Sequence, residues 1–297
     1  MAVIESRVAP IGTNSLPERR FPSFRQRILR NRPASIGLIV LILIGAITAL
    51  TPLFIDADRV TAIDLTSQQQ RPSVERPLGT DELGRDVLVR LLYGGRISLM
   101  VGVGAASIAA TIGVFLGGVS GYFGGRVDAL LMRLTDMVLG LPYFFLLILF
   151  ASLFRPSVLS LTLMIGMLRW TTMARLVRGE FQGLRDRDFV LAARATGRSR
   201  FSIMFSEILP NAMGPIIVQF TIGIAFAILA ESSISYLGLG IRPPTPSWGN
   251  MLSNAQGYLF LAPWLAIVPG LLIFITVLSF NFLGDGLRDA LDPKLRR

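Results

Sequence analysis

Residues 36–53 read IGLIVLILIGAITALTPL, an apolar run without a charged side chain. A helix needs about 20 mostly apolar residues to cross the hydrocarbon core of a bilayer. The arginine-rich segment RQRILRNR precedes this run, and no clear A-x-A cleavage site follows it. We therefore expect a retained membrane span here and not a cleaved signal peptide.

The composition of the whole chain fits a membrane protein and excludes several kinds of active site. Apolar residues make up 52% of the 297 residues and charged residues 16%, which is too hydrophobic for an ordinary soluble domain. The absence of cysteine excludes a disulfide framework, a thiolate metal site and a thiol nucleophile. The absence of histidine removes the commonest general base and metal ligand. We therefore expect no catalytic residue and no metal site, and so no enzyme.

Five further apolar runs predict an all-α integral membrane protein with six spans. The fourth run is the shortest. The spans are expected at Ile36–Leu53, Ile97–Tyr122, Met137–Phe154, Val158–Thr172, Met213–Leu237 and Pro263–Leu283.

The distribution of basic residues predicts that both termini lie inside. With this orientation the inner loops carry 19 arginines and lysines and the outer loops carry eight, as the positive-inside rule requires. Arg133 and Arg169 fall outside this count and are expected near span ends, where a long side chain can reach the interface. Nucleic-acid binding is not favoured, because the arginines sort by membrane side.

The predicted layout is a cytoplasmic tail (1–35), a first span (36–54), a periplasmic loop (55–96), a core of five spans (97–285) and a second cytoplasmic tail (286–297).

The loop 55–96 divides into two parts. Residues 56–77 lack periodicity and predict irregular structure. After them, Thr80 is a candidate N-cap with Asp81 and Glu82 in the first turn, which predicts an amphipathic helix at the outer surface. This helix would either seat the second span or lie at a substrate entrance. Arg85, Arg90 and Arg96 in this segment fit the positive-inside rule poorly.

A basic, glycine-broken segment, LAARATGRSRFSIMFSEILPN, occupies residues 191–211 between the fourth and fifth spans. The sequence predicts a helix that begins near Asp186 or Asp188 and is closed by Gly197 in a left-handed conformation. Ser199 would then cap a second short helix, which Pro210 and Asn211 would break before the fifth span.

The first of these short helices carries an apolar anchor and small residues. Ala192, Ala193 and Ala195 would let another protein approach the backbone closely, and Arg194 and Arg198 are expected on one face. From the residues alone, a helix docked in a partner's groove and a basic helix held by anionic lipid are equally favoured. The apolar anchor is Phe189 and Val190.

This segment resembles the cytoplasmic coupling motif of ATP-binding-cassette (ABC) importer permeases, a glycine-centred loop that sits in a cleft of the ATPase subunit. Two positions depart from the family pattern: Leu191 replaces a frequent acidic residue, and Glu207 replaces a common histidine. The resemblance implies that the ATPase-coupling residues are Ala192, Ala193, Arg194, Gly197, Glu207, Pro210 and Asn211.

The resemblance covers roughly residues 30–297 and points to the dipeptide/oligopeptide/nickel branch, in particular its second permease subunit. Further matching segments, in the family's order, are PLGTDELGRDVLVRLLYGGRISL, GYFGGRVDALLMRLTD, ESSISYLGLGIRPPTPSWGNML and FNFLGDGLRDALDPKL. The implied fold is that of a type I ABC importer permease in the bacterial cytoplasmic (inner) membrane. The implied substrates are di- or oligopeptides, with nickel, glutathione or another small solute as alternatives.

The chain lacks its own energy source. A P-loop needs the pattern G-x-x-x-x-G-K-[S/T], and Lys294, the only lysine, lies in the C-terminal tail. The resemblance implies two separate ATPase subunits that bind ATP and Mg, a second homologous permease that forms a heterodimer with this chain, an extracytoplasmic substrate-binding protein and surrounding lipid. No cofactor is expected in this chain.

A stand-alone secondary transporter is the competing class, since such proteins carry ionisable residues at membrane depth. Glu231 is the best candidate for a translocation pathway, and its alternative is hydrogen bonding to Ser232, Ser233 or a neighbouring span. Asp136 is expected to pair with Arg133 on one helix face, and Pro142 is expected to kink the third span. The weaker candidates are Asp136, Asn281 and Asp285.

Overall fold

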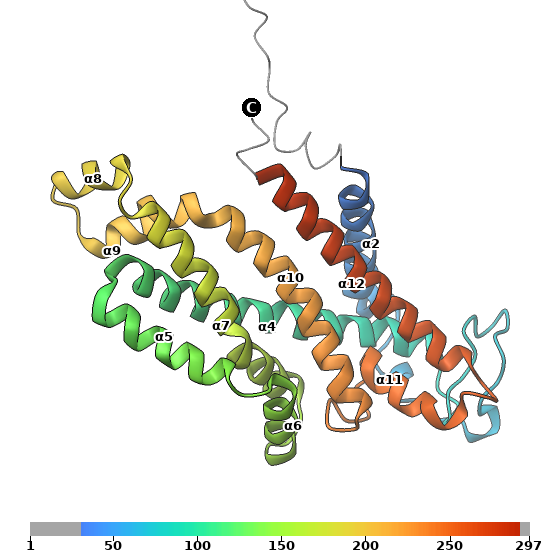
Figure 1. The fold of residues 1–297 in the computed structure, drawn as a ribbon. Helices are drawn as coiled ribbons and strands as arrows, with labels where there is room; N and C mark the ends of the chain where they lie inside the picture. Colours follow the sequence, from blue (N-terminus) through green and yellow to red (C-terminus); the bar gives the residue numbers. More distant parts are fainter. Residues whose placement is uncertain (1–30, 292–297) are drawn as a thin grey trace, which may run out of the picture.

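The computed structural model describes residues 31–291, and this part of the chain contains helices and loops but no named strand. The predicted tail 1–35 therefore lies mostly outside the described residues, as do residues 292–297. Seven long helices form the body (Figure 1). They are α2 (Arg32–Phe54), α4 (Val87–Phe123), α5 (Gly125–Leu139), α6 (Tyr143–Leu153), α7 (Val158–Leu184), α10 (Leu209–Tyr236) and α12 (Trp264–Leu291).

Short helical segments join and cap these long helices. Two of them, α8 and α11, have eight residues each and lie at opposite ends of the molecule (Figure 1). The short segments are α3 (Asp58–Thr61), η1 (Leu65–Ser67), α8 (Asp188–Ala195), α9 (Arg200–Ser202), the π-helix η2 (Ile203–Ile208), α11 (Trp248–Ala255) and η3 (Gln256–Tyr258).

Within residues 31–291, four helices are long and apolar enough to cross a membrane: α2, α4, α12 and the continuous run Arg200–Tyr236. The pair α5 and α6 counts as a fifth if the two are one bent span. The structure thus supports four or five of the six predicted spans. Helix α7 contains the predicted fourth span but is not one of these helices, since arginines and threonines interrupt its apolar run from Arg169 onward.

The tightest packing joins α4 to α7 through glycines. Gly113, Gly117 and Gly121 repeat every fourth residue along α4 and face α7. A Cβ added at Gly117 would lie 2.3 Å from the carbonyl oxygen of Ala174. Small residues at this spacing let two helices approach closely, which is the usual basis of helix association in a bilayer.

The segment 55–96 differs from the prediction. Thr80 does not cap a helix; α4 begins at Val87, with Asp86 accepting hydrogen bonds from the amides of Leu88 and Val89. Because α4 then runs without a break to Phe123, the expected separate surface helix is the first part of a long span.

The arginines that fitted the positive-inside rule poorly are mostly buried. Arg85 pairs with Asp81 and Glu82, both at 2.7 Å, and the Arg90 Nε lies 3.3 Å from Asp81. Arg90 also donates to the carbonyl of Val60 at 3.3 Å. Arg85 and Arg90 can be buried because these ion pairs compensate the cost of removing their charges from water.

The third span is broken as the sequence predicts. Helices α5 and α6 meet at an angle of 77°, and Pro142 is the N-cap residue of α6. Proline removes a backbone donor and clashes with the preceding turn. The expected pairing of Asp136 with Arg133 is wrong, since Asp136 instead accepts a 2.5 Å hydrogen bond from Arg175 of α7.

Candidate functional site

Helix α8 is anchored to the end of the bundle by two side chains. Val190 and Ala193 are three residues apart, so they share one face of the helix, and both are buried. They belong to an apolar cluster with Tyr122 of α4, Phe181 of α7 and Met204 of the π-helix. The predicted outward anchor is thus half wrong, because Val190 packs inside its own chain.

The opposite face of α8 carries apolar side chains without cover. Phe189 is 38% exposed and Leu191 is 48% exposed, and Ala192 between Leu191 and the buried Ala193 is also exposed. Exposed apolar groups at an end of the helix bundle that is rich in arginine are suited to contact with another protein. The face of α8 formed by Phe189, Leu191 and Ala192 is called the α8 face below.

A complete Schellman motif ends α8. Gly197 has φ +77°, its amide donates to the carbonyl of Arg194 at 3.0 Å, and the amide of Arg198 donates to the carbonyl of Ala193 at 3.4 Å. The predicted left-handed role of Gly197 is confirmed by this geometry. No atom lies within 4 Å of a Cβ built at Gly197, so a larger residue there would strain the backbone without a collision.

Arg194 points back to its own chain. It donates to the carbonyl of Arg185 at 3.1 Å, and its guanidinium lies 5.4 Å from the ring centroid of Tyr122. Arg198 lies beyond the end of α8 and pairs with Glu207. The prediction that Arg194 and Arg198 share one helix face is therefore wrong, because the turn at Gly197 separates them.

Glu207, Pro210 and Asn211 lie on a continuous helical run and not at a break. The π-helix passes directly into α10, where Pro210 occupies the first turn and the Asn211 side chain donates to the carbonyl of Glu207 at 2.7 Å. The predicted break at Pro210 is wrong, since the helical run continues from the π-helix through Pro210 into α10. Ser199 does cap the preceding short helix, as predicted.

An ion-pair clamp holds the long helices near α8. Asp128 of α5 accepts two hydrogen bonds from Arg178 of α7, at 2.5 and 2.6 Å. The same carboxylate accepts from Ser120 of α4. A bidentate arginine–carboxylate pair fixes geometry in two directions, so this clamp joins α4, α5 and α7 as one support for α8. The sequence interpretation missed it.

Glu231 lies far from these residues. It is 20 residues beyond Asn211 on α10, which is about 30 Å along a helix. Glu231 is 0% exposed and accepts hydrogen bonds from Ser98 of α4 at 3.0 Å and Ser235 at 2.8 Å. Substrate contact by Glu231 stays a prediction, and these buried hydrogen bonds favour the alternative of bonding to a neighbouring span.

Two further polar side chains, Arg169 and Tyr143, were not predicted from the sequence as site residues. Arg169 is 11 residues from the start of α7, and its place near a span end stays a prediction. Its guanidinium stacks 3.7 Å from the ring centroid of Phe226 on α10. The hydroxyl of Tyr143 on α6 is buried without a hydrogen-bond partner among the described residues. An arginine that interrupts an apolar run was the available signal.

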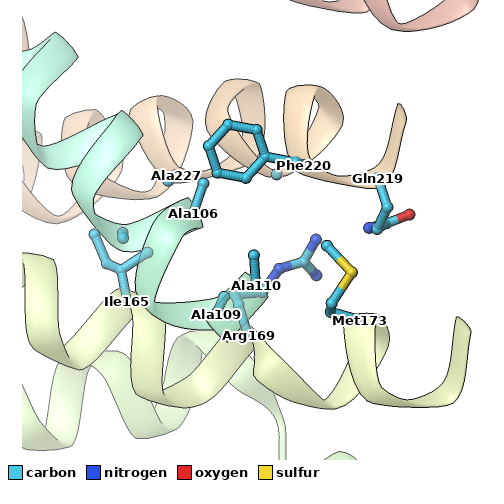
Figure 2. A pocket seen from close by; sticks show the side chains of 11 residues that line it. Ala106, Ala109, Ala110, Ile165, Arg169, Met173, Gln219, Phe220 and Ala227 are labelled. Carbon is cyan, nitrogen blue, oxygen red and sulfur yellow. The ribbon is translucent and has the colours of Figure 1, made fainter. Parts of the chain in front are cut away.

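Arg169 borders two cavities. One, of about 260 Å³, lies at the break between α5 and α6 and is also lined by Tyr143, Thr171 and Thr172. The other, of about 20 Å³, lies between α4, α7 and α10. Figure 2 shows the guanidinium of Arg169 extending from α7 into the second cavity, on the side of Met173 and Gln219.

Comparison with known sequences gives a consistent result. A family described as "Binding-protein-dependent transport system inner membrane component" matches residues 90–297. The chain is 43% identical over 273 residues to the dipeptide transport system permease protein DppC of Bacillus subtilis (strain 168), covering 92% of this chain and 85% of the relative. It is 41% identical over 274 residues to the oligopeptide transport system permease protein OppC of Escherichia coli (strain K12), covering 92% and 90%.

Comparison with solved structures gives the same fold. A chain from "Inward facing conformations of the MetNI methionine ABC transporter" matches with a TM-score of 0.56 and 17% sequence identity. The match covers 69% of this chain and 97% of the other. The helical core therefore has the fold of a chain from an ABC transporter.

Proposed function

The chain belongs to the family of binding-protein-dependent transport system inner membrane components, and from this membership and the geometry of α8 we propose how it is energised and what it carries. The chain is a transmembrane permease subunit of an ABC importer, and its family is one of transport permeases and not of enzymes. We assign it to the bacterial cytoplasmic membrane, where its relatives' transport systems would act.

We propose that α7 also crosses the membrane, which gives six spans with both termini inside. Helix α7 has 27 residues, about 40 Å of helix, which exceeds the hydrocarbon thickness. Its arginines are tolerable there because Arg175 and Arg178 pair with Asp136 and Asp128 of α5, and Arg169 stacks on an aromatic ring. This topology places α8 on the cytoplasmic side.

The single observation that carries the coupling proposal is the α8 face. Phe189, Leu191 and Ala192 project outward, while Val190 and Ala193 lock the helix to the π-helix and the ends of α4 and α7. A partner that grips the α8 face therefore moves the ends of several spans together. We propose that this partner is an ATPase subunit, whose closure on ATP shifts the permease between conformations.

The full transporter would contain four kinds of chain. We propose a second homologous permease as the partner in a heterodimer, two ATPase subunits that bind ATP and Mg, and an extracytoplasmic binding protein that delivers the solute. The proposed solutes are di- or oligopeptides, because the relatives above are named as dipeptide and oligopeptide permeases.

Purification of the tagged chain in mild detergent from its native membrane tests this proposal. The expected result is recovery of ATPase subunits and a second permease, with ATPase activity in the eluate. Phe189→Asp should lower recovery of the ATPase subunits at least tenfold, because buried aromatic anchors dominate protein interfaces and a charge at such a point is left unpaired.

Phe260→Asp is the matched control, since Phe260 is a fully exposed phenylalanine that follows η3, near α11. It should leave ATPase recovery unchanged. Recovery of wild-type chain alone would count against an ABC importer, and full recovery with Phe189→Asp would count against the α8 face as the ATPase contact.

A further inference from the structure

We propose that Arg169, together with Tyr143, binds the carboxylate group of the solute as it crosses the membrane. These two residues are called the Arg169 site. The inference rests on the proposed import function and names a group that the pathway recognises. It begins from the position of one charged side chain.

Arg169 lies deep in the membrane on the proposed topology. It is 11 residues from the start of α7 at Val158, which is about 16 Å along a helix and therefore close to half of a bilayer core of roughly 30 Å. A charge at this depth is costly, and such residues usually face a bundle interior or a water-filled cavity. Arg169 borders two cavities, as this rule requires.

The charge of Arg169 is left without an anion. The other arginines of the transmembrane part of α7, Arg175 and Arg178, each pair with an aspartate of α5. Within residues 31–291, Arg169 makes no hydrogen bond or ion pair, and its guanidinium lies 3.7 Å from the ring centroid of Phe226. Glu231, the buried acid of α10, is already bonded to two serines.

The surroundings of Arg169 fit a carboxylate ligand. A guanidinium offers five donors in a planar fork that matches a carboxylate, and its stacking on Phe226 fixes the plane of that fork. Tyr143 adds a buried hydroxyl that has no hydrogen-bond partner within residues 31–291, and its ring centroid lies 5.2 Å from that of Phe226. Gln219 lines the smaller cavity together with Arg169 (Figure 2). The cavity of about 260 Å³ beside Arg169 and Tyr143 has room for a carboxylate and several waters.

Other occupants are less well supported. A lipid phosphate would require the site to face the acyl chains, whereas Arg169 lines the space between α4, α7 and α10. A fixed acid from the partner permease would cancel the charge of Arg169. These two alternatives give different outcomes in the experiment below.

Cysteine labelling tests the local charge without requiring a known solute. The chain has no native cysteine, so Gln219→Cys places one thiol in the permease. In the assembled transporter, its reaction rates with an anionic sulfonatoethyl and a cationic trimethylammonioethyl methanethiosulfonate are compared. Arg169→Gln should lower the anion-to-cation rate ratio roughly fivefold or more, which is the effect of a unit charge at about 4 Å even in bulk water.

Two controls separate charge from structure. Arg169→Lys keeps the charge and should keep the ratio, whereas Arg175→Gln removes a paired arginine from the same helix and should not change it. A ratio that Arg169→Gln does not change overturns the proposal and indicates a fixed acid beside Arg169. A thiol at position 219 that neither water-borne reagent labels also overturns it and indicates a lipid-facing site.

Uptake then tests the carboxylate itself, with tri-alanine and tri-alanine amide as probes in membranes containing the full importer. The preference for the acid over the amide should fall about tenfold or more with Arg169→Gln, since a hydrogen bond to a charged group is worth at least that factor. The binding protein is the same in the wild-type and Arg169→Gln importers. Its own preference for the acid or the amide therefore cancels when the two importers are compared. An unchanged preference overturns the proposal. If the wild-type importer carries neither peptide, the peptide substrate is wrong, and the labelling ratio still decides the Arg169 site.

Discussion

Helices α8 and α11 have the same length and lie at opposite ends of the protein, yet they are held in opposite ways (Figure 1). Five of the eight residues of α11 are buried, and two of the eight residues of α8 are. Trp248 at the start of α11 is 0% exposed and donates from its indole to the carbonyl of Leu91 at 2.9 Å. Helix α11 is thus part of the core, and α8 is a projection fixed along one edge.

The two helices show that the chain is rigid at α11, where it packs on itself, and exposed at α8, where a partner is proposed to bind. Around α11, Ser98 accepts from the amide of Trp248 and donates to Glu231, so three helices share one hydrogen-bond network. Around α8, hydrogen bonds close the helix end and tie Arg194 back, but the α8 face remains uncovered. Substitutions at the two ends should therefore separate stability from coupling.

Trp248→Ala should have the largest effect on stability. Removing a fully buried tryptophan costs about 3–5 kcal/mol, and the carbonyl of Leu91 would also lose its donor. Unfolding of the detergent-purified complex by heat or by denaturant measures this loss of stability. The matched change on α8, Phe189→Ala, should cost less than about 1 kcal/mol, because Phe189 is partly exposed. Equal losses would contradict the contrast between the two helices.

Glu231→Ala should be the next most damaging change. It would leave the hydroxyls of Ser98 and Ser235 without their buried acceptor, and an unsatisfied buried group costs about 1–3 kcal/mol. Glu231→Gln keeps an acceptor and should be milder. Comparison of uptake with the amount of folded protein checks the role: uptake that falls far more than folded protein would instead support Glu231 in the translocation pathway.

Gly197→Leu and Gly238→Leu form a matched pair. The two glycines have φ of +77° and +76°, and neither has an atom within 4 Å of a built Cβ. Each leucine should cost a similar 1–2 kcal/mol for the left-handed backbone. Transport per folded complex should fall only with Gly197→Leu, because Gly197 closes α8 and Gly238 follows α10 at the other end. Wild-type transport by Gly197→Leu would argue against the coupling role.

Glu207→Gln should have the smallest effect. It breaks an ion pair with Arg198 in which both side chains are partly exposed, and such pairs contribute about 0–1 kcal/mol. Stability should therefore change little, and ATPase activity of the complex in low and high salt measures any change in coupling. A large loss of coupling in low salt alone would show that Glu207 acts on the partner through its charge.

The sequence by itself determined the membrane class, four or five of the apolar spans, the bend at Pro142 and the left-handed turn at Gly197. These features depend on properties local to a few residues: an apolar run, a missing amide donor and the absence of a Cβ. The same local reasoning failed at Thr80 and Pro210. Both residues have the chemistry of a helix boundary, but α4 begins later and the π-helix continues into α10.

The tertiary structure alone decided which charged and apolar side chains are satisfied within the chain. Asp136 pairs across to Arg175 and not along its own helix to Arg133, and Val190 turns inward while Phe189 remains exposed. Arg169 follows an apolar run in the sequence. Only the packing of α4, α7 and α10 shows that its charge has no anion in the described chain. Pairing over tens of residues depends on how helices pack, and periodicity along one helix carries no record of that packing.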